Sequence, residues 1–505
     1  MPQRPIALSE RLVLDHTSSV PLHRQIYQWM HRAILSGQLQ PEQRLPSTRS
    51  LASSLGVSRN TASTAYEQLQ AEGYLERTVG RGTMVARVFL DHRPSGHLAA
   101  PPAAPALAPF AQALITHLPS VPTSLLNVRP AGPRAFRLGM PDLEQFPLDL
   151  WAHLLARQAR RSLSQHLDYQ ESAGYAPLRE ALAAYLAVTR GVRCQADQVV
   201  ITSGTQASLD LIIRLLVGKE ERVWMEDPGY PGARMVLESV GARLTFVPVT
   251  AHGLDVAAGK ALCPFARLVY ITPSHQFPLG VTMNLEQRLA LVQWAQEVDA
   301  WILEDDYDSE YRFSPRPVEA LQGLDRADQS IYLGSLSKVL FPSLRLGYMV
   351  VPARLRDLCM MAQRFQTTHP PILEQLALAD FFAQGHFARH QRRMRSLYAA
   401  RREVLLTAMR RECGHLLTAQ PPEAGMHLVG WLAPGIVDTA VEQHARERGL
   451  EVLALSSLSH QPLARGGLVL GYAACSEQEI QRGVRLLAEI LQELGECSAE
   501  SAPKD

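Results

Sequence analysis

The sequence predicts a multidomain chain, in which a linker joins a small N-terminal α+β module to a larger α/β domain. The first observation is the length of 505 residues, which exceeds that of one ordinary domain. The second is a Pro- and Ala-rich stretch at 89–134, whose composition favours an extended, semi-rigid chain. The third is the alternation of short β-branched runs with amphipathic helical patterns over 135–495. We therefore expect domains at 17–88 and 135–495.

The composition is that of a globular protein with a modest local charge imbalance. Hydrophobic residues make up 46% of the chain and the net charge is +1, yet residues 1–88 hold ten arginines and no lysine against six acids. A local excess of this kind fits a nucleic-acid-binding module. The six cysteines show no C-x-x-C spacing, so we expect no disulfide framework and no metal. Without a signal peptide or a membrane-spanning apolar run, we expect a cytoplasmic protein with no membrane contact.

The N-terminal module begins with an amphipathic helix. In PLHRQIYQWMHRAILSG, Leu22, Ile26, Met30 and Ile34 recur every four residues and form one apolar stripe, which ends at Gly37.

Two short helices follow and predict a helix-turn-helix. LPSTRSLASSLG (45–56) ends in a glycine, and the next segment, 57–75, has Ser58 as a plausible N-cap. The second helix would be the recognition helix, because its first turn, Arg59 to Thr61, stands where base edges are reached. Residues 75–86 then alternate like a hairpin with GRG at the tip, where an arginine can enter a minor groove or meet phosphates.

The ordered motifs RLPSTRSLA, GVSRNT, AY, EGYL and GRGT resemble the winged helix-turn-helix of the GntR regulator family over residues 17–86. The resemblance implies binding to double-stranded operator DNA, with arginines that could hold guanine or phosphate bidentately. The alternative is a three-helix interaction module with solvated arginines. The DNA-contact candidates are Arg49, Ser58, Arg59, Asn60, Thr61, Arg81 and Gly82.

In the large domain, five short runs are expected to be buried strands. One of the chain's four lysines, Lys338, follows the last of these runs in GSLSKVLFPSLRLGY. A lysine in a cleft can form a Schiff base with an aldehyde cofactor. Pyridoxal 5'-phosphate (PLP) would then need phosphate donors, a carboxylate at its ring nitrogen, a donor to its phenolic oxygen and a flat group against the ring. The expected strands are 199–202, 222–226, 268–272, 301–304 and 330–333.

The sequence offers a candidate for each of these needs. Ser203, Gly204 and Thr205 open a helix, where free N–H groups and hydroxyls hold anions. Asp305 stands just beyond a strand end, and a carboxylate there keeps the ring nitrogen protonated. Each signal alone is more often an ordinary cap, turn or surface loop. The further candidates are Ser335, Ser337 and Arg345 for the phosphate, Tyr307 for the phenolic oxygen and Tyr230 for stacking.

Taken in order, SGT, PGY, PSHQFP, EDDY, SxSK and RLGY resemble the fold type I PLP-dependent aminotransferases. A winged helix fused to such a domain resembles the MocR/GabR subfamily of GntR regulators over nearly the whole chain. The resemblance implies a transcription factor that binds PLP, senses a small-molecule effector and forms a homodimer. It also puts Tyr169 near the dimer interface, where it would reach the partner's cofactor phosphate or serve equally as a core or interface tyrosine.

Two stretches depart from the enzyme pattern. Val469 stands where aminotransferases usually carry the arginine that pairs with the substrate carboxylate, and losing that clamp should weaken amino-acid binding. Arg465 or Arg364 could replace it. In PSHQFPLG, Phe277 and Leu279 replace the Asn and Thr of N-P-T-G.

The same stretch leaves the phenolic oxygen with two further candidate partners. His275 or Gln276 could take over that contact, or His275 could be a buried structural histidine.

The sequence therefore predicts a PLP-binding transcriptional regulator that senses an amino acid, an amine or PLP itself, with at most a residual transaminase half-reaction. One alternative is an active aminotransferase that also binds DNA, against which Val469 argues. The other is a regulator whose large domain is only a dimerisation scaffold. The joint presence of five candidate cofactor residues argues against that one: Lys338, Asp305, Tyr307, Tyr230 and Arg345.

Overall fold

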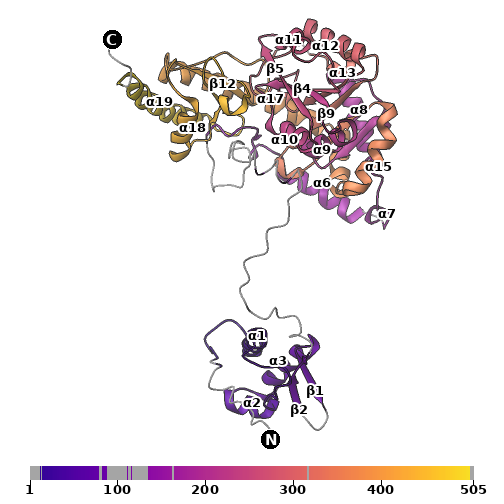
Figure 1. Ribbon diagram of the computed structural model, residues 1–505, viewed down its shortest axis with the longest axis vertical. Helices are drawn as coiled ribbons and strands as arrows, with labels where there is room; N and C mark the ends of the chain where they lie inside the picture. Colours follow the sequence, from indigo (N-terminus) through magenta and orange to yellow (C-terminus); the bar gives the residue numbers. More distant parts are fainter. Residues whose placement is uncertain are drawn as a thin grey trace. The chain divides into compact units, whose positions relative to one another are not determined.

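The computed structural model describes residues 12, 14–78, 82–87, 111, 115, 135–161, 164–314 and 318–500. Arg81 and nearly all of the expected linker lie outside these residues. The chain divides into two compact units, Met1–Ala106 and Leu107–Asp505 (Figure 1).

The N-terminal unit contains the helices and the hairpin that the sequence predicts. Helices α1 (Leu22–Leu35), α2 (Thr48–Leu55) and α3 (Arg59–Ala71) precede strands β1 (Leu75–Thr78) and β2 (Gly82–Val85), which pair antiparallel. Gly56 ends α2 in the left-handed conformation, with φ 64°. The apolar stripe of α1 is buried against the other helices. Its core includes Ile26, Met30, Ile34, Leu51, Ala62, Ala65, Tyr66 and Leu69.

A single large sheet organises the second unit. Its eight strands in the described residues run in the order β3-β10-β9-β8-β7-β4-β5-β6. Strands β4, β5, β7, β8 and β9 are parallel to their neighbours in this group, whereas β10 is antiparallel to both β3 and β9. The strand bounds are β3 Val199–Thr202, β4 Arg222–Asp227, β5 Arg243–Thr250, β6 Gly253–Leu254, β7 Leu268–Ile271, β8 Trp301–Asp306, β9 Ser330–Ser335 and β10 Gly347–Val350.

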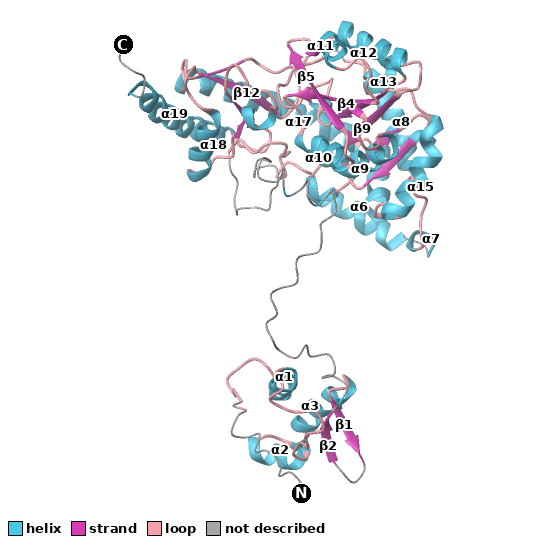
Figure 2. Cartoon of the chain, in the orientation of Figure 1, coloured by secondary structure: helices cyan, strands magenta, loops and turns pink. Residues whose placement is uncertain are grey.

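The central strands are buried because helices cover both faces of the sheet (Figure 2). This explains why the five predicted strands read as continuous apolar runs and not as alternating ones. The helices of this part are α6 Leu148–Arg161, α7 Ser164–Leu167, α8 Ala176–Arg190, α9 Thr205–Leu216, α10 Pro231–Ser239, α11 Val256–Leu262, α12 Leu285–Val298, α13 Leu321–Leu324, α14 Leu336–Val339, α15 Arg356–Thr367 and α16 Ile372–Ala383.

The C-terminal part is a smaller α/β layer with its own core. Its antiparallel sheet has the order β11-β12-β14-β13, and the long helices α17 and α19 pack against each other. The elements are α17 His386–Glu412, β11 Leu417–Ala419, β12 His427–Leu432, α18 Asp438–Glu447, β13 Leu453–Ala454, β14 Gly467–Gly471 and α19 Glu477–Glu500. In the part of the chain that the structure describes, no helix has the length and apolarity to cross a bilayer.

Candidate functional site

The topology brings four predicted segments to one edge of the large sheet. Strands β7, β8 and β9 are parallel neighbours, so the loops that follow them start at the same edge. His275 and Tyr307 lie in the segments that follow β7 and β8, Asp305 lies near the end of β8, and Lys338 lies in α14 just after β9. Strand β3 is antiparallel to β10, as is β9, so the start of α9 after β3 lies at that edge too. Ligands of open α/β sheets bind at this carboxyl edge.

Lys338 lies in the short helix α14, directly after β9. Its Nζ donates a hydrogen bond of 3.0 Å to the carbonyl oxygen of Gly139. Burial lowers the pKa of Lys338, and the negative charges of Asp308 and Asp305 act in the opposite direction. A lysine with a lowered pKa is neutral more often and is a better nucleophile toward an aldehyde.

Asp305 is the penultimate residue of β8 and therefore lies within the strand, not just beyond its end as the sequence predicted, because pairing with β9 continues to Asp306. One of its carboxylate oxygens has no partner among the described residues. The Tyr270 hydroxyl donates to Oδ2 at 2.8 Å, whereas Oδ1 is buried and accepts no hydrogen bond from the described residues. Burial raises the pKa of Asp305 to about 7. A buried carboxylate oxygen without a donor is costly, and the protonated ring nitrogen of PLP is the kind of group that would satisfy it.

The start of α9 forms an open cradle with Arg345. Gly204 has φ 103°, and a Cβ there would stand 3.6 Å from the Arg345 guanidinium. The Thr205 hydroxyl is buried and has no hydrogen-bond partner among the described residues. Free N–H groups at a helix start, with a guanidinium and a spare hydroxyl beside them, suit a phosphate group. Ser203 is half-buried in the same turn.

Ser335 and Ser337, the two further phosphate candidates, lie at the start of the short helix α14. Ser335 is buried at the N-cap of α14, and its side chain forms no capping hydrogen bond. The Ser337 hydroxyl lies 3.5 Å from the carbonyl oxygen of Leu346, a long contact that leaves it able to turn toward an anion.

Two of the predicted tyrosines, Tyr230 and Tyr307, lie close enough to Asp305 for its charge to act on their pKa. Tyr230 precedes α10 and packs edge-to-face on Phe277, with 5.6 Å between the ring centroids. Burial raises the pKa of Tyr230 to about 12. Tyr307 follows β8, and its hydroxyl lies 3.0 Å from Nδ1 of His275. His275 is buried, and its Nδ1 also meets the Asp308 carboxylate at 3.0 and 3.1 Å.

Other predicted residues have different surroundings. Gln276 donates to the carbonyl oxygens of Pro228 and Phe277, so its amide braces its own loop. The Tyr169 side chain is 78% exposed, and its ring meets His369 edge-on. A tyrosine so exposed in one chain is available to a second one.

Val469 is buried in an apolar cluster. It lies on β14, is fully buried and packs among hydrophobic side chains. Arg465 instead reaches the carbonyl oxygens of Leu432 and Trp431, and Arg364 is an exposed residue of α15. The buried members of the cluster are Phe277, Val429, Leu453, Leu455, Leu458 and Val469.

The predicted DNA-contact residues gather at the starts of α2 and α3. Arg49, Arg59 and Asn60 are exposed. The Ser58 hydroxyl accepts from the backbone N–H of Thr61 at 3.1 Å and therefore caps α3. Gly82 opens β2, and Arg81 lies outside the described residues.

Sequence reasoning missed four residues of these two sites. Arg44 lies beside the hairpin, with its Nε 3.4 Å from where a Cβ on Gly82 would stand. Its position in QRLPSTR, five residues before Arg49, was a usable signal. Gly139, Tyr270 and Asp308 had weaker signals, because their roles depend on contacts between distant segments.

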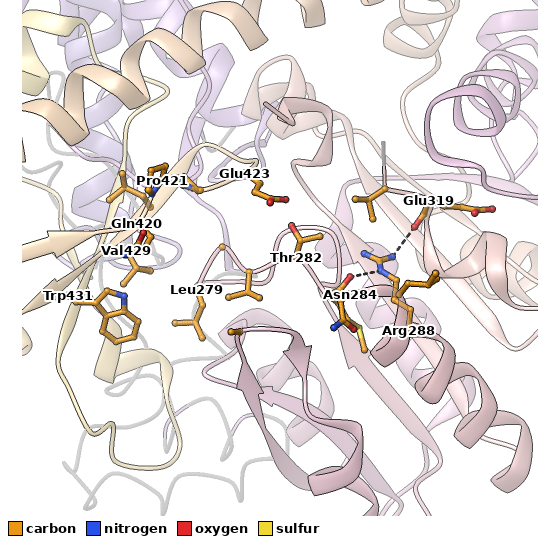
Figure 3. A pocket seen from close by; sticks show the side chains of 18 of the residues that line it. Leu279, Thr282, Asn284, Arg288, Glu319, Gln420, Pro421, Glu423, Val429 and Trp431 are labelled. Atoms are coloured by element: carbon orange, nitrogen blue, oxygen red, sulfur yellow. Dashed lines mark hydrogen bonds between the residues drawn. The ribbon is translucent and has the colours of Figure 1, made fainter. Parts of the chain in front are cut away.

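The structure also has a cavity whose lining does not include Lys338. Its volume is about 640 Å³, and it lies between the segment that includes α12 and the β11–β12 region (Figure 3). Three backbone carbonyls hold the Arg288 guanidinium at its wall, and burial lowers the pKa of Arg288. We place the functional site at Lys338 because the groups around it, and not those of the cavity, have unsatisfied polar atoms suited to a cofactor.

Comparison with known proteins agrees with both halves of this description. Residues 22–85 match the model of the bacterial regulatory proteins of the gntR family, and residues 138–487 match that of aminotransferase class I and II. The chain is 41% identical to the probable rhizopine catabolism regulatory protein MocR of Rhizobium meliloti, over 94% of this chain and 95% of that one. It is 32% identical to the pyridoxine biosynthesis transcriptional regulator PdxR of Corynebacterium glutamicum, over 96% and 97%.

A solved aminotransferase structure has the same fold as the large domain. The α-aminoadipate aminotransferase LysN of Thermus thermophilus, complexed with N-(5'-phosphopyridoxyl)-L-leucine, matches with a TM-score of 0.67 and 27% identity. The match covers 75% of this chain and 99% of LysN.

The two domains together define a DNA-binding transcriptional regulator with a fold type I aminotransferase-like domain. The chain belongs to the MocR family of GntR-type regulators.

Proposed function

We propose that this regulator binds PLP through Lys338 and that a small molecule controls its binding to operator DNA. The observation that carries the proposal is the buried, unpartnered Oδ1 of Asp305, in a group where Asp305 and Lys338 are close enough to shift each other's pKa. A fold kept only as a scaffold has no reason to keep this carboxylate unsatisfied.

Each part of the cofactor would have a holder in this chain. Lys338 would bind the aldehyde, Asp305 the ring nitrogen, Tyr307 the phenolic oxygen, and Tyr230 would stack on the ring. When bound, PLP supplies an aldehyde and an electron-withdrawing ring that react with primary amines. The phosphate would be held by Ser203, Gly204, Thr205, Ser335, Ser337 and Arg345.

The surroundings of Val469 favour an effector without an α-carboxylate. A carboxylate placed against Val469 and its apolar neighbours would be desolvated without the arginine that aminotransferases usually carry at this position, which is unfavourable. PLP itself, or an amine, meets no such penalty. One relative is named for pyridoxine biosynthesis, which fits PLP as the effector. The same missing clamp argues against efficient transamination.

The exposed apolar residues of one face support a homodimer. Leu358, Met361 and Phe365 follow one stripe of α15, and these residues are 47%, 61% and 87% exposed. Leu167 and Tyr169 are also exposed. A second copy of the chain would cover such a surface and bring Tyr169 to the partner's site. Two winged helices could then meet two half-sites of operator DNA in the cytoplasm.

The test is the visible absorption spectrum of the purified protein with added PLP, measured for wild type, Lys338→Ala and Lys219→Ala. Lys219 is an exposed lysine and serves as the matched control. We expect a visible band in wild type and Lys219→Ala but not in Lys338→Ala, with all three equally folded. Absence of the band from wild type would leave a regulator with a scaffold domain. Release of operator DNA on adding PLP or amines, followed by fluorescence anisotropy, then identifies the effector class.

A further inference from the structure

The contacts around His275 raise a question of hydrogen bonding. Its Nδ1 meets both the Asp308 carboxylate, at 3.0 and 3.1 Å, and the Tyr307 hydroxyl, at 3.0 Å. An imidazole nitrogen carries either one proton or one lone pair, so it cannot donate to the carboxylate and accept from the hydroxyl at once.

The position of the Asp308 carboxylate indicates whether Nδ1 of His275 carries a proton or a lone pair. Both Asp308 oxygens face Nδ1, and an ionised carboxylate can only accept hydrogen bonds. We therefore assign the proton to Nδ1, which leaves Nε2 with the lone pair. Nε2 is buried and has no partner among the described residues. A buried nitrogen lone pair without a donor is less unfavourable than a buried N–H group without an acceptor, which supports the same assignment.

The surrounding backbone holds the imidazole in this position. A Cβ on Gly425 would stand 2.0 Å from Cε1 of His275, and one on Gly280 would stand 3.1 Å from Nε2. Both glycines have positive φ, 88° and 74°. The backbone of two glycines therefore approaches the ring closely, which restricts its movement.

The second histidine near His275 does not compete for Asp308. His427 of β12 lies 4.8 Å from His275 between ring centroids, and its Nε2 faces the carbonyl oxygen of Pro278 at 3.1 Å. Burial, and then the neighbouring His275, hold the pKa of His427 well below its usual range. His427 is thus a neutral donor to the backbone.

With Nδ1 donating to Asp308, the Tyr307 hydroxyl cannot donate to His275. Burial, followed by the charges of Asp308 and Asp305, raises the pKa of Tyr307 well above its ordinary value, so the hydroxyl keeps its proton. Tyr307 is half-buried and lies beside the group that contains Asp305 and Lys338. Its proton is therefore available to an acceptor placed in that space.

We propose that Asp308 and His275 are positioning residues that keep the Tyr307 hydroxyl as a hydrogen-bond donor to the phenolic oxygen of the cofactor. This inference rests on the proposed binding of PLP. His275 would act on the cofactor through Tyr307, without contacting the cofactor itself. Asp308 fixes the tautomer of His275, and the tautomer fixes the direction of the Tyr307 proton.

The pH dependence of the cofactor's visible band reports this hydrogen bond. Negative charge on the phenolic oxygen helps to keep a proton on the nitrogen that links Lys338 to the cofactor. A donor to that oxygen weakens this effect, so losing the donor should raise the pH midpoint of the band. We expect Tyr307→Phe to raise it by about one pH unit, a tenfold change in proton affinity.

Two amide variants at His275 separate positioning from packing. In His275→Asn the amide nitrogen takes the place of Nδ1 and can still donate to Asp308, so the midpoint should stay at the wild-type value. In His275→Gln the amide reaches the place of Nε2, Tyr307 is drawn toward Asp308, and the midpoint should rise as in Tyr307→Phe. The double variant Tyr307→Phe with His275→Gln should show no additional rise.

Tyr472→Phe is the matched control. It removes a buried hydroxyl that donates to the carbonyl oxygen of Gly425 at 2.7 Å, next to His275 but outside the proposed contacts. Its midpoint should equal that of wild type. Asp308→Asn is less informative, because Asp308 also acts on Lys338 through its charge.

The proposal is wrong if the two amide variants shift the midpoint equally, or if Tyr307→Phe leaves it unchanged while the band is retained. Should His275→Gln fail to fold, judged by circular dichroism, the comparison of Tyr307→Phe with His275→Asn still decides, because a shift in both contradicts the proposal. Absence of any band in wild type overturns the cofactor proposal itself, and with it this inference.

Discussion

Gly139 and Lys338, which lie 199 residues apart in sequence, meet at the centre of the candidate site. The Lys338 Nζ donates to the Gly139 carbonyl oxygen at 3.0 Å, and a Cβ on Gly139 would stand 2.4 Å from the same nitrogen. Gly139 also has φ 66°, which side-chain-bearing residues rarely adopt. The Lys338 amine can therefore occupy this position only because residue 139 has no Cβ.

Gly139→Ala should reduce the affinity for PLP while the protein stays folded. The lysine tip is flexible and would move away from the new methyl group, so the effect falls on cofactor binding, which we expect to weaken at least about tenfold. The left-handed backbone adds a strain of about 1–3 kcal/mol. Gly385→Ala is the control, because Gly385 has φ 70° but nothing within 4 Å of its would-be Cβ. Equal PLP affinities of the two variants, measured by absorbance titration, would contradict the prediction that a side chain at position 139 displaces Lys338.

Asp305→Asn should change how stability depends on pH. Burial raises the pKa of Asp305 to about 7 in the protein without cofactor, so folding favours its protonated form. Its contribution to stability is present below pH 4 and is lost as the pH rises through 7. We expect the cofactor-free variant to be more stable than wild type at pH 8, by on the order of 1–4 kcal/mol, and equal to it at pH 4.

The measurement for Asp305→Asn is chemical denaturation of both proteins at several pH values. Glu226 is also buried, with its pKa raised to about 7 by burial and, to a smaller extent, by the charge of Asp305, so the difference between wild type and variant includes a smaller change at Glu226. PLP should bind the variant much more weakly, because a neutral amide does not keep the ring nitrogen protonated. A variant that binds PLP as wild type does would show that Asp305 is not its partner.

The elements of the fold could largely be predicted from the sequence. Runs such as 301–304 are apolar without alternation because the strand is buried on both faces, and Gly56 ends its helix because only glycine readily adopts that conformation. The contacts within the site could not be predicted in the same way. Asp308 reaches His275 across 33 residues only because β7 and β8 are neighbours in the sheet, and no local pattern specifies that neighbourhood.

Arg59→Ala should weaken binding to operator DNA more than binding to random DNA. Arg59 is exposed in the first turn of α3, where a recognition helix meets base edges. Loss of a base contact costs about 1–3 kcal/mol and relaxes discrimination at that base. Arg24→Ala removes the same charge from an exposed site on α1 and serves as the control. Equal losses on operator and random DNA, measured by fluorescence anisotropy at one fixed salt concentration, would mark Arg59 as a phosphate contact.

The apolar surroundings of Val469 predict a preference that a matched pair of ligands can test. Phenylalanine and phenethylamine share their side chain and amine and differ by one carboxylate. Because Val469 provides no positive charge and its neighbours in the cluster are apolar, the carboxylate would lack a cationic partner at this position. We therefore expect the amine to perturb the cofactor band at a concentration about tenfold lower. Arg465 cannot rescue the amino acid without giving up its contacts to Leu432 and Trp431. If the amino acid instead perturbs the band at the lower concentration, a carboxylate site exists elsewhere, and Arg465→Ala and Arg364→Ala would show which arginine provides it.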